Sequence, residues 1–430
     1  MKIHNLWLSL AKVIGVSHAH TVDCTPSAIQ ALLPPESSAS VTFAYSLPEN
    51  ATFQVPASDI GFPSSPSNLP ALCAVEVKVP SSASSSYSFG LFLPAGGRWN
   101  GRFLAVGNSG FAGGVNWADM KLTYWGYRAL HSSVVLAKAL TRRFYYGSRH
   151  PAHMHMYSYY SGCSTGGRQG LIEAERFPAD FDGIVAGAPA CDWVEANQTF
   201  IFPHLEYGSE AQWDMLTGAD APTTLGTDYV KYVLGLGPDW RWEDFNPGII
   251  ALSEQMNPGN ATADNFDLTP FYRRGGKLIH YHGLADGGIA PGSSMYFYNQ
   301  VLRRLKPKGI DLDEFYRLFL VPGLQHCANT PPRMNAPWYF AGMNQQTVLG
   351  TVIYSVPGFA DARHDILLAL VEWVERGTAP DQIIATKWVN DTLHDTVARQ
   401  RPVCVYPKHA MYTGTGDVDE AQNWRCERLY

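Results

Sequence analysis

A serine between two glycines is the first residue with chemical potential in this sequence. Residues 162–166 read Gly-Cys-Ser-Thr-Gly and match the pattern G-x-S-x-G, in which a sharp strand-to-helix turn projects the serine hydroxyl. A strand-like run at 154–161 precedes this pattern, and a helical pattern at 167–177 follows it. The pattern therefore predicts that Ser164 is a nucleophile. The alternative is an idle serine in a glycine-rich turn.

A serine nucleophile needs a base to take its proton and an acid to orient that base. After a G-x-S-x-G turn the acid and then the histidine follow in chain order, each on a loop after a later strand. Asp286 follows the strand-like run 277–281, and His326 follows the run 316–321. We expect both residues to complete a catalytic triad with Ser164, although a single aspartate or histidine after a strand is more often a turn or surface residue.

Two cysteines strengthen this prediction. Cys163 directly precedes Ser164, and Cys327 directly follows His326. A disulfide between them would hold their Cα atoms about 4.4–6.8 Å apart and would bring the hydroxyl and the imidazole together. Closing so long a loop could also stabilise the fold by roughly 5 kcal/mol on the chain-entropy model. If Cys163 were instead a free thiol, the thiol itself would be a rival nucleophile.

Ester chemistry at Ser164 would also need donors for the oxyanion. We expect these to be the backbone N–H of Thr165 and a second N–H from the glycine-rich loop that follows the strand-like run 102–106, at Gly110. The other interpretation of this loop is a plain turn.

Composition bounds the class of protein. The 430 residues are 46% hydrophobic and 16% charged, which excludes a disordered chain. The net charge is −6 and basic residues form no run, so we expect no nucleic-acid partner. Beyond the N-terminus no apolar stretch reaches the roughly 18 residues of a membrane-spanning helix, so we expect no membrane partner.

The N-terminus predicts secretion. Residues 1–19 combine Lys2, an apolar run at 6–16 and a small-x-small end, which is typical of a signal peptide, although an ordinary helix is the alternative. Seven cysteines without C-x-x-C spacing favour disulfides over a zinc site, and the odd number leaves one unpaired. Four N-x-T sequences are candidate glycosylation sites: Asn50, Asn197, Asn260 and Asn390.

The order of elements predicts an α/β protein. Strand-like runs alternate with helical patterns at 127–140, 167–177 and 365–376, which indicates a mainly parallel sheet covered on both faces. Residues 191–269 are rich in aromatic residues, glycine and proline and show weak periodicity, as expected of an inserted lid. His280 and His282 alternate on one strand-like run but lack a third metal ligand, so we interpret them as core or loop histidines.

Five motifs together resemble the tannase and feruloyl esterase family of secreted fungal esterases. They are WNGRFLAVGN at 99–108, GCSTGGRQG at 162–170, GAPA at 187–190, HGLAD at 282–286 and GLQHC at 323–327.

The resemblance implies an α/β-hydrolase fold for residues 20–190 and 270–430, with 191–269 as its lid. It implies the triad Ser164, Asp286 and His326, and cleavage of feruloyl or galloyl esters of small molecules or plant-wall polysaccharides. It also implies a pairing for each cysteine: Cys163–Cys327, Cys24–Cys73 and Cys404–Cys426, with Cys191 unpaired.

The sequence departs from this family in two places. Only about 20 residues separate Val106 from the helix at Tyr127, where the family has a further strand, and residues 122–125 are the sole strand candidate there. We therefore expect an unpaired edge or a rearranged sheet. The family's lid carries a calcium loop that 191–269 lack, so we expect a reduced lid, no cofactor and no metal. The alternative function is that of a truncated, catalytically impaired relative, which is either a protein that only binds plant-wall ligands or a gene-model variant that lacks a strand and most of the lid.

Overall fold

A computed structural model describes residues 22–57, 59, 64–95, 97–108, 110, 115, 117, 127–147, 155–191, 227–349 and 359–428. The predicted signal peptide, the strand candidate at 122–125 and Asn197 lie outside these residues. Among the described residues, no helix combines the length and apolarity needed to cross a bilayer.

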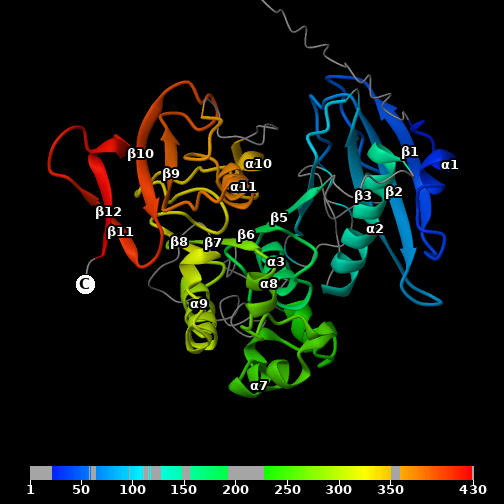
Figure 1. Ribbon diagram of the computed structural model, residues 1–430. Coiled ribbons are helices and arrows are strands. Elements are labelled where there is room, and N and C mark those ends of the chain that lie inside the picture. The colour runs from blue at the N-terminus through cyan, green and yellow to red at the C-terminus, as the bar shows by residue number, and fades with distance from the viewer. Residues whose placement is uncertain are drawn as a thin grey trace, which may run out of the picture.

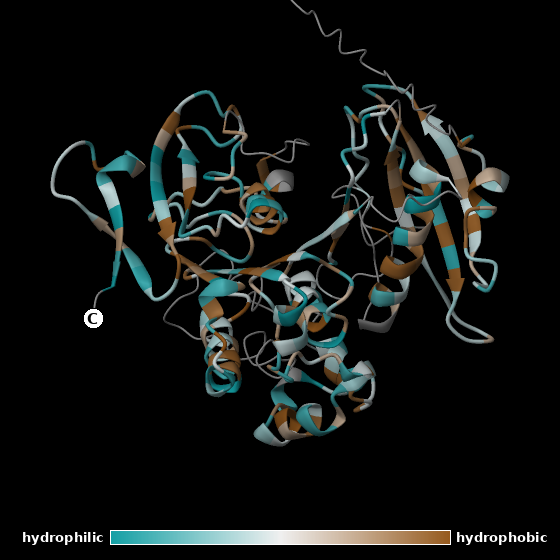
Figure 2. Ribbon diagram, in the orientation of Figure 1, coloured by the Kyte–Doolittle hydropathy of each residue, from teal (hydrophilic) through white to brown (hydrophobic). Residues whose placement is uncertain are grey.

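Five parallel strands form the central sheet, in the order β4-β5-β6-β7-β8. Every residue of β6 is buried, as are nearly all residues of β5 and β7, because helices cover both faces of the sheet. Figure 2 shows the corresponding hydrophobic stretches in brown along the middle of this sheet. The strands are β4 (Arg102–Val106), β5 (Tyr157–Cys163), β6 (Gly183–Gly187), β7 (Lys277–Gly283) and β8 (Tyr316–Val321).

Helices pack on each face of the sheet. Figure 1 shows α3 (Thr165–Arg176), α8 (Thr269–Arg273) and α9 (Pro291–Leu305) on one side and α11 (Ile366–Arg376) on the other. The helix α11 begins at Asp365, whose side chain accepts the N–H groups of Leu367 and Leu368, and it ends at Gly377 in the left-handed conformation. Its apolar side packs on β6 and β7.

Smaller sheets flank the central one. An antiparallel sheet of β1 (Ser40–Leu47), β2 (Leu72–Pro80) and β3 (Ser86–Pro94) packs against α2 (Tyr127–Tyr146). At the other end of the molecule two strand pairs follow one another, the second a largely hydrophilic ribbon (Figures 1 and 2). The remaining helices and strands are α1 (Pro26–Gln30), α10 (Gln345–Leu349), β9 (Gln382–Trp388), β10 (Val397–Cys404), β11 (Lys408–Tyr412), β12 (Trp424–Arg428), η5 (Lys306–Lys308), η6 (Leu312–Glu314) and η7 (Ala421–Asn423).

The described part of the predicted lid, residues 227–269, carries its own small core. Trp240 is buried there against Tyr229 and Ile249, so this aromatic ring belongs to the packing of the segment. Its elements are η2 (Tyr229–Val233), η3 (Trp242–Asp244), α7 (Pro247–Met256) and η4 (Pro258–Asn260).

Strand β4 is the outermost strand of the described part of the sheet, where it pairs only with β5. The strand candidate at 122–125 lies outside the described residues, so the expectation of an unpaired edge or a rearranged sheet stays a prediction. A groove of about 570 Å³ lies between β4 and α11. Arg102 of β4 crosses to Glu375 of α11 with two hydrogen bonds of 2.6 and 2.7 Å, and a charged residue on an edge strand opposes pairing with other chains.

Two glycines explain how tightly β5 turns into α3. A Cβ atom on Gly166 would lie 2.7 Å from the carbonyl oxygen of Asn108 and 3.1 Å from the Cα atom of Gly107. A Cβ atom on Gly162 would lie 2.5 Å from the carbonyl oxygen of Gly166. The loop after β4 can therefore pack against the start of α3 only because these positions lack side chains.

The substitution Gly166→Ala should destabilise the protein by about 1–3 kcal/mol, because the methyl group would meet backbone atoms that cannot rotate away. Gly292→Ala in the first turn of α9 is the matched control, since its added Cβ would meet no described atom within 4 Å apart from its chain neighbours and the backbone of its own helix. Denaturant unfolding would measure both variants. Equal stabilities would contradict this account of the turn.

Candidate active site

Ser164 lies at the tip of the turn between β5 and α3. Its backbone adopts φ 65° and ψ −123°, an unfavourable conformation for a residue with a side chain. Hydrogen bonds hold it there: its N–H donates to the Gly187 carbonyl at 3.0 Å, and its own carbonyl accepts from Arg168 at 3.1 Å. This is the strained turn that G-x-S-x-G predicts, and the side chain is partly exposed.

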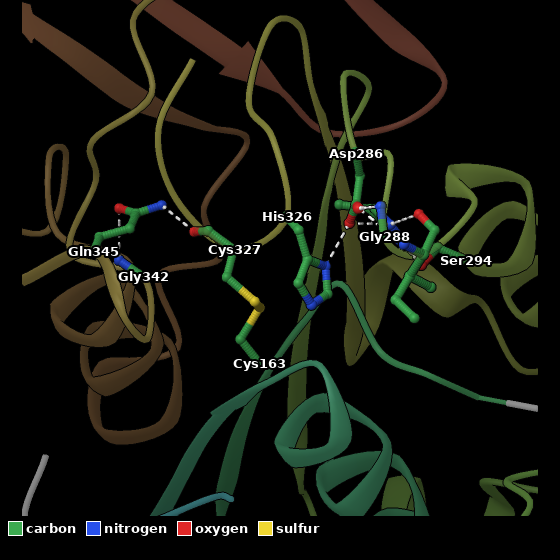
Figure 3. Close-up of a disulfide and its surroundings, with 10 residues drawn as sticks. Cys163, Asp286, Gly288, Ser294, His326, Cys327, Gly342 and Gln345 are labelled. Atoms are coloured by element: carbon green, nitrogen blue, oxygen red, sulfur yellow. Dashed lines mark hydrogen bonds and ion pairs between the residues drawn. A yellow bond between two sulfur atoms is a disulfide. The ribbon is translucent and has the colours of Figure 1, made fainter. Parts of the chain in front are cut away.

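Asp286 lies in the loop after β7, and its carboxylate is fully buried. One oxygen, Oδ1, accepts the backbone N–H groups of Gly288 at 2.7 Å and Ile289 at 2.9 Å. The other, Oδ2, lies 2.8 Å from Nδ1 of His326 and 3.1 Å from Nε2 of His282. Four donors therefore fix the position of this carboxylate (Figure 3).

His326 lies in the loop after β8, and its side chain is 26% exposed. The loops after β7 and β8 hold each other: the N–H of Leu284 donates to the Val321 carbonyl at 2.9 Å, and the N–H of Ala285 donates to the Leu324 carbonyl at 3.0 Å. These bonds position the imidazole with one nitrogen on Asp286 and leave its other nitrogen for a reacting group.

The environment shifts the pKa values of both members of this pair. Burial alone would raise the pKa of Asp286, but the positive charge of His326 and hydrogen bonds from His282 and His326 lower it well below the usual range. Burial alone would lower the pKa of His326, but the charge of Asp286 and the hydrogen bond to it raise that pKa above 6.5. The carboxylate is thus ionised whenever the histidine is ready to act as a base.

A disulfide joins Cys163 to Cys327, with their Cα atoms 6.0 Å apart (Figure 3). It ties the residue before Ser164 to the residue after His326. Gln345 supports the histidine side of this bridge, because its Nε2 donates to the Cys327 carbonyl at 3.2 Å. The rival hypothesis of a Cys163 thiol nucleophile is wrong, because its sulfur is bonded to Cys327.

The other cysteines pair as the resemblance implies. Disulfides join Cys24 to Cys73 and Cys404 to Cys426, whereas Cys191 is buried and forms no disulfide. The first bridge fastens the segment before α1 to β2, and the second joins β10 to β12.

The predicted oxyanion donors lie next to the nucleophile. Thr165 is the first residue of α3, so its N–H has no acceptor within the helix. Its hydroxyl donates to the Gly110 carbonyl at 2.8 Å, which places the loop after β4 against the start of α3. The role of Thr165 and Gly110 as oxyanion donors stays a prediction, and residues 109 and 111–114 of that loop lie outside the described residues.

Three of the four candidate glycosylation sites are described. Asn50, Asn260 and Asn390 are all exposed, as attachment of a glycan requires. Their modification stays a prediction.

Potential metal ligands gather at one place in the described ranges, and none of them belongs to the predicted triad. His131, Glu173 and Asp180 offer ligand atoms within 4.8 Å of one another. Nδ1 of His131 already bonds Oδ2 of Asp180 at 2.6 Å, and Lys138 donates to the Asp180 backbone carbonyl at 2.6 Å. A lysine ammonium group beside the cluster opposes a cation there, and the arrangement fits a buried polar network between α2 and α3.

The sequence interpretation missed part of the site. His280 and His282 are fully buried, as expected of core histidines, but His282 also bonds the carboxylate of Asp286. Ser294 of α9, which bonds both histidines, was not singled out at all. The alternation of the two histidines toward one face of β7 and the close spacing of His282 and Asp286 were the available signals.

Comparison with known proteins places this geometry among relatives. The family model described as tannase and feruloyl esterase matches residues 114–215 and 243–427. A protein named probable feruloyl esterase B-2 from Aspergillus terreus is 26% identical over 83% of this chain and 86% of its own length.

Two solved structures share the fold. An esterase from Aspergillus oryzae superposes with a TM-score of 0.77 at 23% identity, covering 94% of this chain and 99% of that one. Feruloyl esterase B from the same organism superposes with a TM-score of 0.73 at 24% identity, covering 93% of this chain and 100% of that one. The parallel sheet, its helical layers and these superpositions confirm the predicted α/β-hydrolase fold.

Removing the Cys163–Cys327 bridge should cost more stability than removing Cys404–Cys426. The first bridge closes a loop of 164 residues and the second one of 22 residues. The chain-entropy model then gives losses of about 5 and about 3 kcal/mol. Denaturant unfolding of the two double Cys→Ala variants without reductant measures the difference, and a larger loss for the shorter loop would contradict the prediction.

Proposed function

The chain belongs to the tannase and feruloyl esterase family, whose members are carboxylic ester hydrolases, and we propose that it cleaves phenolic esters through an acyl-enzyme on Ser164. The observation that carries this proposal is the pairing of His326 with the buried carboxylate of Asp286, which the Cys163–Cys327 bridge ties to the serine turn. The acyl groups proposed are feruloyl, other hydroxycinnamoyl or galloyl groups, because a relative is named a feruloyl esterase and the family includes tannases.

In the first half of the reaction, Nε2 of His326 takes the proton of the Ser164 hydroxyl as its oxygen attacks the ester carbonyl. Asp286 keeps the proton of Nδ1 directed toward itself, which leaves Nε2 as the base, and it stabilises the imidazolium that forms. The backbone N–H of Thr165 and an N–H of the Gly110 loop donate hydrogen bonds to the carbonyl oxygen and stabilise the negative charge that develops on it.

In the second half, the tetrahedral intermediate collapses. The imidazolium gives its proton to the leaving alcohol, and the acyl group remains on Ser164. His326 then deprotonates a water molecule, which attacks the acyl-enzyme, and the acid is released as the proton returns to the serine. Every proton that His326 takes up is given back within the cycle, and the proposed steps use no cofactor or metal.

The alternative of a catalytically impaired relative depends on the shortened sequence between β4 and α2 and on the reduced lid. Strand β4 lies on the far side of β5 from β7 and β8, which carry the loops of Asp286 and His326. The pairing of these two residues is intact, so the geometry favours an active enzyme. We further propose that the protein is secreted after loss of residues 1–19, is glycosylated at exposed acceptors, and acts on small phenolic esters or on plant-wall polysaccharide esters.

The variant Ser164→Ala should lose hydrolysis of methyl ferulate, methyl gallate and methyl caffeate by about 10⁴-fold or more, because it removes the nucleophile. Ser293→Ala in the first turn of α9 is the control, since it removes a buried serine outside the triad. Rates on all three esters give the acyl preference. A folded wild-type protein that turns over none of them, or a fully active Ser164→Ala variant, would overturn the proposal.

The pH dependence of kcat/KM should report the raised pKa of His326. The imidazole must be neutral to accept a proton, so activity falls as pH drops through that pKa. We expect the midpoint of this acid limb above 6.5, because the Asp286 carboxylate stabilises the imidazolium. The measurement needs an ester that does not itself ionise in this range. A midpoint at or below 6.5 would contradict the assigned electrostatics.

A further inference from the structure

A chain of buried hydrogen bonds runs behind the carboxylate of Asp286. It starts at the Tyr316 hydroxyl, 2.7 Å from Nδ1 of His280. Ser294 then joins the two histidines, its Oγ lying 2.7 Å from Nε2 of His280 and 2.6 Å from Nδ1 of His282. The chain ends where Nε2 of His282 meets Oδ2 of Asp286. Figure 3 shows Ser294 and Asp286 at this place.

The contacts of His282 fix where its proton lies. Its Nε2 is 3.1 Å from Oδ2 of Asp286 and 3.0 Å from the Ile289 carbonyl oxygen, and both of these are acceptors. Nε2 must therefore carry a hydrogen, because a lone pair there would face two oxygen atoms. A neutral His282 then has an unprotonated Nδ1, which accepts the hydroxyl hydrogen of Ser294.

The rest of the chain follows from the single hydrogen of Ser294. Once Ser294 donates to His282, its oxygen can only accept from His280, so Nε2 of His280 carries a hydrogen. The unprotonated Nδ1 of His280 then accepts from the Tyr316 hydroxyl. Every donor in the chain thus points toward Asp286, and every group in it is neutral.

A protonated His282 would reverse each of these bonds. Its Nδ1 would donate to Ser294, Ser294 to His280, and His280 to Tyr316. That arrangement places a cation on a side chain with no solvent exposure, next to a second fully buried histidine. Burial lowers the pKa of His280 well below its usual range, so His280 itself carries no charge. The neutral arrangement is therefore the one that the site favours.

From this geometry we propose that His282 is a positioning residue for the reaction: with Ser294, His280 and Tyr316 behind it, it holds the Asp286 carboxylate toward His326 through a one-way hydrogen-bond chain. The effect of His282 on catalysis rests on the proposed function. The positions of the hydrogens in the chain do not depend on that function.

The chain should act in two ways. First, a hydrogen bond from His282 keeps Oδ2 in the orientation that bonds Nδ1 of His326, so that Nε2 of His326 faces the nucleophile. Second, a donor on Oδ2 withdraws part of the negative charge that His326 would otherwise experience. Among the described residues, the titratable side chains near His282 are Asp286, His280 and His326, the last of which lies on the other side of the Asp286 carboxylate.

Nuclear magnetic resonance of ¹⁵N-labelled histidines tests the proton arrangement without any need for activity. We expect His280 and His282 both to be neutral with hydrogen on Nε2, and His282→Gln identifies the second signal by its loss. A hydrogen on Nδ1 of His282, or an imidazolium at neutral pH, would overturn the chain.

Two variants of His282 test its role in the reaction. A glutamine amide nitrogen can replace Nε2 and keep the donor to Asp286, whereas asparagine reaches only the place of Nδ1. We expect His282→Asn to lower kcat by about 10- to 100-fold and to move the acid limb of kcat/KM upward by about 0.5–1 pH unit. His282→Gln should restore most of the rate and leave the limb near its wild-type position.

Controls separate positioning from folding. The amplitude of the acyl-enzyme burst gives the concentration of active sites. Each rate is divided by this concentration, so unfolded protein does not lower the measured kcat. Ser294→Ala, which removes one oxygen only, should shift the limb in the same direction and serves if His282→Asn does not fold. His364→Gln changes another buried histidine bonded to a carboxylate, that of Asp361 at 2.9 Å, and should change neither rate nor limb.

The outcomes distinguish this inference from the proposed function. Equal losses in both His282 variants with an unmoved acid limb would show a structural role only and would overturn the inference. An active wild type with unaffected His282 variants would overturn it as well, while leaving the esterase proposal intact. A wild type without esterase activity but with the expected histidine protons would retain the chain and reject the function.

Discussion

The buried charge of Asp286 sets the terms on which the active site can form. A carboxylate with no solvent exposure is costly unless donors satisfy both of its oxygens. The loop after β7 supplies two backbone N–H groups, β7 itself supplies His282, and the loop after β8 supplies His326. Folding these segments in any other way would leave the charge unpaired, so the stability of this region and the orientation of the histidine have the same physical origin.

The Cys163–Cys327 disulfide joins two loops that start from strands lying apart in the sheet. β5 carries Ser164, and β8 leads to His326, with β6 and β7 between them. At about 4.8 Å per strand the histidine loop must reach back roughly 14 Å. The Cys163–Cys327 bridge joins the histidine loop to the end of β5, and Gln345 donates a hydrogen bond to the Cys327 carbonyl of the same loop. The buried charge thus orients the imidazole, while the bridge ties the histidine loop to the serine turn.

A polar network lies beside β4, the outermost strand of the described part of the sheet. Arg102 bonds Glu375 of α11, and the hydroxyl of Tyr159 donates to the same carboxylate at 2.8 Å. This polar network and the groove beside it share no residue with the Asp286–His326 pair.

Periodicity and turn chemistry predicted the strands β4, β5, β7 and β8, the helix α11 and an α/β protein, and the neighbours of Ser164 and His326 suggested the Cys163–Cys327 bridge. The α/β-hydrolase fold and the other two disulfide pairs were implied by the family resemblance. The same reasoning placed Ser164, Asp286 and His326 as the candidate triad. It could not find the chain behind Asp286, since Ser294 and Tyr316 have no motif of their own. Only the packing of α9 and β8 against β7 brings these hydroxyl groups to the two histidines. Which nitrogen of His282 carries the proton was likewise decided by tertiary structure, because it depends on two oxygen atoms from a turn that the sequence leaves unspecified.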